Sequence, residues 1–470
     1  MARPGFESVV LVTGFPSLYV CKMIERILHA EPSSFLYLTV DSTRAAEGHA
    51  YLASMTAKNR DRLQLLEGSA TAIDFGLSGA EFRRLTREVD LIHHMAGTDD
   101  AAASLADAQL LNIQSAAEVL EIARASSCLR CLVFHSTAAV SGERRGTVLE
   151  SDLDEGQSFR SATQQTRMRA ERMIRKAMAN VPIAVLRPTS IVGGALHAKA
   201  RPSARDRRES ARNLSGAADL DWTEAGEAEQ APNLPAAGAG DAGDAEAQPK
   251  DLASAVEASP AGKSAAVEME SGAQSANSFW AGRSISPPRE SEQLEGIHLL
   301  LLLLIAAPLE LSIPLPKSSA DMPLPLVHLD YAVQAGHAIG RDPNAVGRTF
   351  HITDPNPPTV KHVIDLVQAR AKDRSDRGFI PSDLARMLLR TPGIERFVRN
   401  PRSFMELLFL PVHYDAGNTK ELLSSTGIEC PPFDSYVDGL IHAVEEHIRR
   451  RRDRRAGGAD SEAEVDDPLL

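Results

Sequence analysis

The chain has 470 residues, of which 43% are hydrophobic and 24% charged, and carries a formal net charge of -12. This length and apolar content are enough for two or three domains with a substantial core. The acidic balance provides no basic surface of the kind that nucleic acids or anionic membranes require, so we expect neither partner.

The first residues of the chain and its longest apolar run lead us to expect no membrane segment. The first residues, MARPGFESVV, lead directly into an apolar strand without the features of a secretory signal, so the simplest expectation is a cytoplasmic protein. The run at 299–307 stops at Pro308 and reaches about half of the roughly 20 residues that a membrane span needs. We interpret it as a buried core helix and expect no transmembrane segment.

Cysteine content excludes a disulfide framework. The four cysteines, Cys21, Cys128, Cys131 and Cys430, are few and scattered for a chain of this size. Cys128 and Cys131 have redox-motif spacing, but Cys131 opens an apolar strand instead of a helix. Without a second pair we expect no zinc site, and we interpret these residues as packing residues.

The first part of the chain alternates apolar strands with amphipathic helices. Strands are expected at 8–14, 35–40, 63–68, 89–97, 131–137 and 183–194, with helices at 19–30, 111–126 and 163–178. Continuous apolar strands separated by helices indicate a parallel sheet that is covered on both faces. The expected fold class is therefore α/β, a Rossmann-type doubly wound parallel sheet.

Composition divides the chain into four segments. We expect a Rossmann-type NAD(P)-binding domain at 8–194 and a disordered low-complexity insertion at 195–290, where large apolar residues are almost absent. A smaller, mostly helical region at 291–450 is expected to return to the sheet as a substrate domain. A charged, disordered tail follows at 451–470.

Several motifs occur in order along these elements. They are LVTGFPSLYV, FHSTAAVSGERRG, SATQQTRMRAE, LRPTSIVGG and VHLDYAV. Together they resemble the extended short-chain dehydrogenase/reductase superfamily, and within it the thioester reductase and fatty acyl reductase (male sterility) branch. The resemblance covers roughly 8–194 and 294–450.

The turn motif of that superfamily, TGxxGxxG, is only partly present. Thr13 and Gly14 match it, whereas Ser17 and Val20 stand where the second and third glycines belong. These glycines let the backbone approach the pyrophosphate and let the helix pack close to the strand. We therefore expect a weakened or lost dinucleotide site, and a plain strand-turn-helix is the alternative.

The resemblance implies further cofactor contacts. Asp41, directly after the second strand, would bind the adenosine ribose and favour NAD over NADP, although Arg44 leaves this open. Ser69 stands where an adenine-side aspartate is usual. Ala96 and Gly97 would border the cofactor, and Pro188 would shape the nicotinamide pocket.

Two histidines precede this cofactor segment. We interpret His93 and His94 as packing and loop residues and expect no metal site, since no third ligand is near in sequence.

The resemblance also implies four catalytic positions. Asn112 matches the assisting Asn, and Thr137 matches the residue that hydrogen-bonds the substrate carbonyl. Thr163 and Arg167 replace the Tyr and Lys, and neither reproduces the acidic phenol or the ammonium. We interpret these two as solvated helix residues.

The replacement of the catalytic Tyr leaves the source of a proton open. Tyr331 and Tyr414, which lie in the companion region, are the candidates for a rescuing role.

Three functions remain in competition. The chain is expected to be an oxidoreductase-like protein for a small acyl or carbonyl substrate, a thioester, aldehyde or alcohol, with weak or no hydride transfer. The alternatives are a non-catalytic binding or regulatory protein on this fold, and a scaffold whose insertion or tail recruits a protein partner. The resemblance also leaves a homodimer open.

Overall fold

The computed structural model describes residues 5–100, 103–193, 320–375 and 411–442. The expected insertion at 195–290, the apolar run at 299–307 and the tail at 451–470 lie outside these residues. Their structure, and the domain boundaries that depend on them, stay predictions.

Seven strands form one parallel sheet, in the order β10-β7-β5-β4-β1-β2-β3. The strands are β1 (Ser8–Phe15), β2 (Ser34–Val40), β3 (Leu63–Glu67), β4 (Leu91–His94), β5 (Cys131–His135), β7 (Ile183–Pro188) and β10 (Thr349–Ile352). Strand order reverses at β1, which is the doubly wound pattern. The Rossmann-type fold class expected from the sequence is confirmed.

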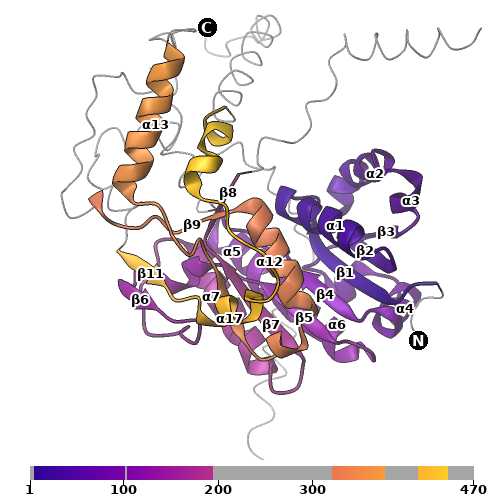
Figure 1. Cartoon of the computed structure of the whole chain (residues 1–470). Helices are drawn as coiled ribbons and strands as arrows, with labels where there is room; N and C mark the ends of the chain where they lie inside the picture. Colours follow the sequence, from indigo (N-terminus) through magenta and orange to yellow (C-terminus); the bar gives the residue numbers. More distant parts are fainter. Residues whose placement is uncertain (1–4, 101–102, 194–319, 376–410, 443–470) are drawn as a thin grey trace, which may run out of the picture. The chain divides into compact units, whose positions relative to one another are not determined.

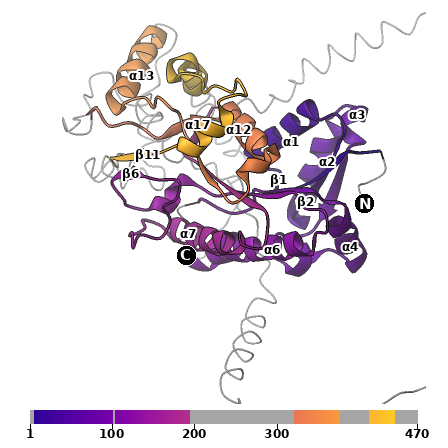
Figure 2. The ribbon, with the colours of Figure 1, turned by 60° about the horizontal axis from the view of Figure 1, so that its bottom comes forward.

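Helices cover both faces of the sheet (Figure 2). One face carries α1 (Leu18–Ala30) and α12 (Leu329–Arg341), and the other carries α4 (Gly79–Glu88), α6 (Ser115–Ala125) and α7 (Ala162–Ala177). Alternate residues of β1 supply the two cores: Val10 and Val12 face α1, while Val9 and Leu11 face α6. Burial on both faces explains why this strand is a continuous apolar run.

The C-terminal part of the chain completes the sheet. Strand β10 pairs with β7, and α12 packs beside α1 (Figure 1). Two small parallel pairs join distant segments: β6 (Gly146–Val148) with β11 (Val412–Tyr414), and β8 (Ser190–Val192) with β9 (Leu326–His328). The return of the companion region to the sheet therefore occurs through backbone pairing as well as side-chain packing.

The remaining helices are short or lie at the periphery. They are α2 (Ala45–Ala53), α3 (Ala57–Arg60), α5 (Leu105–Ala108), α13 (Val360–Ser375) and α17 (Gly417–Leu423), with a π-helical turn at Gln109–Gln114 and 3-10 turns at Ser42–Arg44, Ile73–Gly76, Ala138–Ser141, Pro343–Ala345 and Phe433–Ser435. None of the helices in the described ranges is both long and apolar enough to cross a bilayer.

Candidate functional site

The turn between β1 and α1 is tied to the end of β4. Buried Thr13 accepts hydrogen bonds at Oγ1 from the backbone N–H groups of Met95 and Ala96, both at 3.1 Å. Gly14 has a φ of 84°, and a β-carbon on it would lie 2.7 Å from the Met95 carbonyl. The Thr-Gly pair therefore serves the close approach of two loops at the carboxyl edge of the sheet.

The two positions that lack a glycine differ in environment. Ser17 is the N-cap of α1 with a φ of −72°, an ordinary conformation for a residue with a side chain. Its side chain makes no capping bond, while its carbonyl accepts from Cys21 N at 2.9 Å. The N–H groups of Leu18, Tyr19 and Val20 therefore have no acceptor within α1 or in the Ser17 side chain. Val20 is 1% exposed and belongs to the core beneath α1. Its side chain is thus buried instead of facing the free end of the helix.

Asp41 follows β2 at the same edge of the sheet. Its Oδ1 accepts hydrogen bonds from Thr43 N at 3.0 Å and Thr43 Oγ1 at 2.8 Å. Arg44, which left the cofactor choice open, forms an ion pair with Glu47 at 2.7 Å. Ser69, after β3, makes a local hydrogen bond to Thr71 at 2.9 Å. Among the described residues, no hydrogen bond to the second carboxylate oxygen of Asp41 occurs beside these two.

Asn112 fixes the loop that follows β4. Its side chain accepts from Thr98 N at 2.8 Å, donates to Thr98 O at 3.0 Å and donates to Thr166 Oγ1 at 3.0 Å. It is 2% exposed and lies in the π-helical turn before α6. Both N–H bonds of the Asn112 amide and one lone pair of its oxygen are engaged, so the side chain joins this loop to α7.

Thr163 and Arg167 are both buried, so the interpretation of these residues as solvated was wrong. They are 2% and 6% exposed. Thr163 Oγ1 lies 2.8 Å from Ser161 Oγ. Arg167 donates from Nε to Asp99 at 3.0 Å and lies so close to Gly97 that a β-carbon there would be 2.5 Å from Nη1. The loop after β4 covers this end of α7.

Thr137 follows β5 and is partly exposed. Its Oγ1 accepts from Ala139 N at 3.2 Å, which leaves its hydroxyl hydrogen free to donate to a ligand. The adjacent Ser136 is buried and donates to Glu171 at 2.5 Å. Glu171 in turn pairs with buried Arg187 at 2.6 Å. Of the two neighbouring hydroxyls, only that of Thr137 remains available at the surface.

Pro188 ends β7 beside this edge. It is buried and pairs with Ile352 of β10. Four of the expected cofactor positions meet at one place, namely Thr13, Gly14, Ala96 and Gly97. Asp41 follows β2 and Pro188 ends β7 at other points along the same edge of the sheet.

A chain of hydrogen-bonded polar side chains was missed at the sequence level; its two histidines are buried and Tyr19 is partly buried. Tyr19 OH lies 3.2 Å from His135 Nδ1, and His135 Nε2 lies 3.1 Å from His93 Nδ1. Burial raises the pKa of Tyr19 and lowers the pKa of His135 to about 3. His93 Nε2 has no partner among the described residues. The only sequence signal was the position of the two histidines near the ends of expected strands.

His94, the second histidine of the pair, and the two cysteines Cys128 and Cys131 behave as packing residues. His94 stacks on Phe134 with ring centroids 5.6 Å apart, and its Nδ1 lies 3.0 Å from Thr13 Oγ1. Cys131 is buried, and desolvation raises the pKa of its thiol to about 12. Cys128 Sγ contacts the carbonyl of Val89 at 3.4 Å. Among the described side chains, no group of three His, Cys, Asp or Glu residues could hold a metal.

The two tyrosines of the companion region have different positions. Tyr331 is 7% exposed within the core beneath α12. Tyr414 OH donates to Ala138 O at 3.2 Å and lies 2.9 Å from Ser141 Oγ, so it reaches the loop that begins at Thr137. Burial raises the pKa of Tyr414. Its phenol is therefore near the site but engaged in structural hydrogen bonds.

The strand order and the turn that follows β1 define a Rossmann-type fold. Residues 21–215 match the model of the family described as "Male sterility protein". The resemblance to the male sterility branch is thereby confirmed for this region. The matched region begins one residue after Val20, so the turn with the replaced glycines lies outside it.

One curated protein also matches part of the chain in sequence. The chain is 27% identical over 173 residues to an alcohol-forming fatty acyl-CoA reductase of Simmondsia chinensis, a match that covers 33% of this chain and 35% of that relative. The chain thus matches about a third of the length of that protein.

Solved structures show the same fold at low identity. The terminal R domain of the myxalamid PKS-NRPS biosynthetic pathway has 17% identity and a TM-score of 0.58, with 94% of this chain and 92% of that chain covered. Yeast methylglyoxal/isovaleraldehyde reductase Gre2, complexed with NADPH, has 11% identity and a TM-score of 0.53, with 95% and 99% covered.

Proposed function

We propose that this reductase-type protein binds a nicotinamide nucleotide weakly and has little or no hydride-transfer activity on acyl thioesters, aldehydes or alcohols. The observation that carries the proposal is the burial of Arg167. Its side chain is 6% exposed, lies against Gly97 and donates a hydrogen bond to Asp99. This residue stands at the position of the lysine that the resemblance implies.

The proposal also depends on the lack of a suitable proton donor among the described residues. Thr163 has an aliphatic hydroxyl that does not ionise near neutral pH, and it is hydrogen-bonded to Ser161. Among the described tyrosines, Tyr19 and Tyr414 are linked to the surroundings of Thr137 through His135 and Ala138. Burial raises the pKa of both phenols, which makes each a weaker acid.

The residues fit a dinucleotide only in part. The open N-terminus of α1 suits a pyrophosphate, and Asp41 suits a ribose hydroxyl. Arg167 lacks the free ammonium of a lysine, and its paired guanidinium is held by Asp99. A bound nicotinamide would supply or accept a hydride, and Thr137 would hold the substrate carbonyl oxygen.

Asp41 supports a preference for NAD over NADP. Its carboxylate would repel a 2′-phosphate, and Arg44 is already paired with Glu47. We therefore expect NADH to bind more tightly than NADPH, both more weakly than micromolar. The measurement is a titration of the full chain with each nucleotide by calorimetry. Micromolar binding of either would overturn the weakened-site proposal.

A substitution tests the basis of the cofactor preference. Asp41→Asn removes the repulsion and should raise the NADPH affinity relative to that of NADH. Glu47→Gln, an exposed control in the helix that follows, releases Arg44 without touching Asp41. If Asp41→Asn leaves the ratio unchanged while Glu47→Gln shifts it, Arg44 and not Asp41 sets the preference.

Restoring the missing pair tests the catalytic part. Thr163→Tyr with Arg167→Lys should raise reduction of a medium-chain aldehyde by about a hundredfold, because a positioned general acid contributes about that much or more. The matched control is Thr163→Phe with Arg167→Lys, which has the same ring and no hydroxyl. Equal rates in the two variants, or a fully active parent protein, would contradict the proposal.

The alternative is a non-catalytic binding or regulatory role. It follows if Thr163→Tyr with Arg167→Lys is as inactive as its phenylalanine control while NADH still binds. The partly exposed Thr137 and the free helix end of α1 would then serve a ligand without chemistry.

A further inference from the structure

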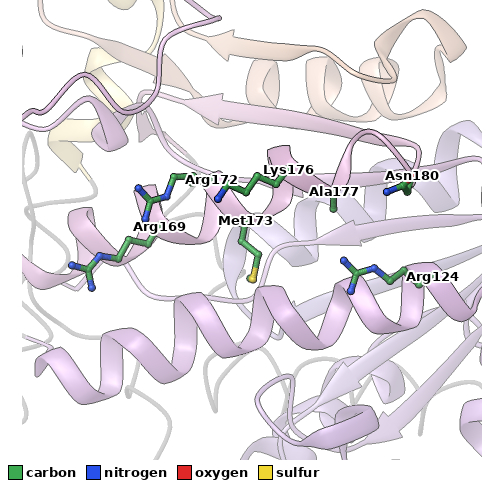
Figure 3. Close-up of a pocket in the computed structure, with 7 residues that line it drawn as sticks. All are labelled: Arg124, Arg169, Arg172, Met173, Lys176, Ala177 and Asn180. Atoms are coloured by element: carbon green, nitrogen blue, oxygen red, sulfur yellow. The ribbon is translucent and has the colours of Figure 1, made fainter. Parts of the chain in front are cut away.

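A pocket lies between α6 and α7 (Figure 3). Its volume is about 390 Å³, within the range of roughly 300–1,000 Å³ that is typical of small-molecule sites. Arg124 reaches it from α6, and the other lining side chains come from α7 and the turn that follows. These are Arg169, Arg172, Met173, Lys176, Ala177 and Asn180.

Helical spacing gathers the cations on one side of α7. Arg169, Arg172 and Lys176 follow one another at intervals of three and four residues, so they lie on one face. Arg169 and Lys176 are seven residues apart, or about 10 Å along the helix axis. Arg167 is buried whereas Arg169 is exposed, which places the pocket on a different side of α7 from Gly97.

The cations of the pocket are only partly neutralised. Arg124 pairs with Glu121 on its own helix, and Arg172 pairs with Asp154 at 2.6 Å. Within the described ranges, neither Arg169 nor Lys176 has an acidic partner. Two positive charges therefore remain on the wall of the cavity, although the chain as a whole carries a net charge of -12.

We infer that this pocket binds a small anion that carries more than one phosphate group. Guanidinium groups form two parallel hydrogen bonds to phosphate oxygens, and an ammonium adds a point charge. A row of cations about 10 Å long suits two or more phosphates better than a single one. Like charges at these spacings repel each other, and a bound polyanion would offset that repulsion.

Inorganic pyrophosphate and tripolyphosphate are the probes for calorimetry on the full chain at a salt concentration of about 150 mM, where exposed charges are partly screened. We expect tripolyphosphate to bind more tightly than pyrophosphate. Arg169→Gln with Lys176→Gln should weaken both at least tenfold. Because both side chains are exposed, the fold should persist, which circular dichroism would verify.

The control removes two cations elsewhere. Lys58→Gln with Arg60→Gln, on exposed positions of α3, produces the same change in net charge. Affinity should remain within a factor of two of the parent protein. Equal losses in the two variants would overturn the inference, because they would indicate non-specific attraction. Unchanged affinity in Arg169→Gln with Lys176→Gln would also overturn it, because the anion would then bind elsewhere, for example at the N-terminus of α1.

A different occupant would equally overturn the proposal. A peptide with the acidic sequence of residues 459–470 serves as the competitor. If that peptide binds in an Arg169-dependent and Lys176-dependent way while millimolar pyrophosphate does not bind, the pocket recognises an acidic protein segment instead of a phosphorylated small molecule.

Discussion

The guanidinium of Arg167 lies against the α-carbon of Gly97, close enough that a β-carbon on Gly97 would be 2.5 Å from Nη1. The same guanidinium donates to Asp99 two residues further on. This contact joins α7 to the loop after β4 at the edge where the resemblance places a cofactor. The arginine therefore has a structural partner whether or not a nucleotide binds.

Gly97→Ala should destabilise the protein by more than about 1 kcal/mol. Gly97 has a φ of 142°, which residues with a side chain rarely adopt, and the new methyl group would displace Arg167. Urea unfolding measures the change in the free energy of unfolding. Gly439→Ala is the control, because no described atom lies within 4 Å of the position that its β-carbon would take. Equal stability of Gly97→Ala and the parent would contradict the close contact.

Thr13→Val should cost roughly 2 to 4 kcal/mol of unfolding free energy. Valine has a similar shape but leaves the N–H groups of Met95 and Ala96 without the acceptor they share. Thr13→Ser keeps the hydroxyl and should lose much less. The comparison uses denaturant unfolding of the three proteins. A valine variant as stable as the serine variant would show that the hydroxyl contributes little.

Acid should destabilise the protein between pH 6.5 and pH 5. Burial lowers the pKa of His94 and His135 to about 3 and of His351 to about 4, and that of His93 well below 6.5. The unfolded chain then binds protons below pH 6.5 that the folded chain does not, so stability falls as pH falls. Each histidine contributes about 2 kcal/mol over this interval.

Buried carboxyls such as Glu150 act in the opposite direction, as do Glu118 and Asp354, whose pKa values burial also raises. Desolvation raises the pKa of Glu150, so its contribution to stability increases as pH falls toward 4.5. Four histidines outweigh them in the expected balance. Urea midpoints at about pH 7.5 and about pH 5 test this, with His29→Gln as an exposed control that should keep the same slope. Equal midpoints at the two pH values would refute the prediction.

Glu150→Gln should loosen the C-terminal part of the fold. Its carboxylate accepts from His351 N at 2.8 Å, Asn418 N at 2.6 Å and Thr419 Oγ1 at 3.1 Å. An amide retains one acceptor oxygen, so we expect a loss of about 1 to 3 kcal/mol. Limited proteolysis should cut near α17 sooner than in the parent. The exposed Glu155→Gln is the control, and identical digestion of both variants would argue against this tether.

The order and type of the main elements could be predicted from the sequence. Strands buried on both faces are continuous apolar runs, as in β1, and amphipathic helices such as α1 have one apolar side. Helix α4 was missed, although Ser78 and Glu81 form a capping box that marks its start.

For the candidate site, the sequence predicted which positions belong to it but not the contacts that its side chains make. Motif spacing located Thr13, Gly14 and Asn112, because such spacing depends on neighbours along the chain. The link from Tyr19 to His135 joins a helix to a separate strand, and no local pattern indicates it.

By itself the sequence determined the doubly wound sheet and the replacement of the Tyr and Lys positions, because periodicity and residue identity are local properties. Only the tertiary structure decided that Thr163 and Arg167 are buried. Helical periodicity assigns residues to a face, but what covers that face comes from Gly97 and Asp99, which lie far away along the chain. Burial is a property of the packed neighbours, and it changed Arg167 from a surface cation into a structural contact.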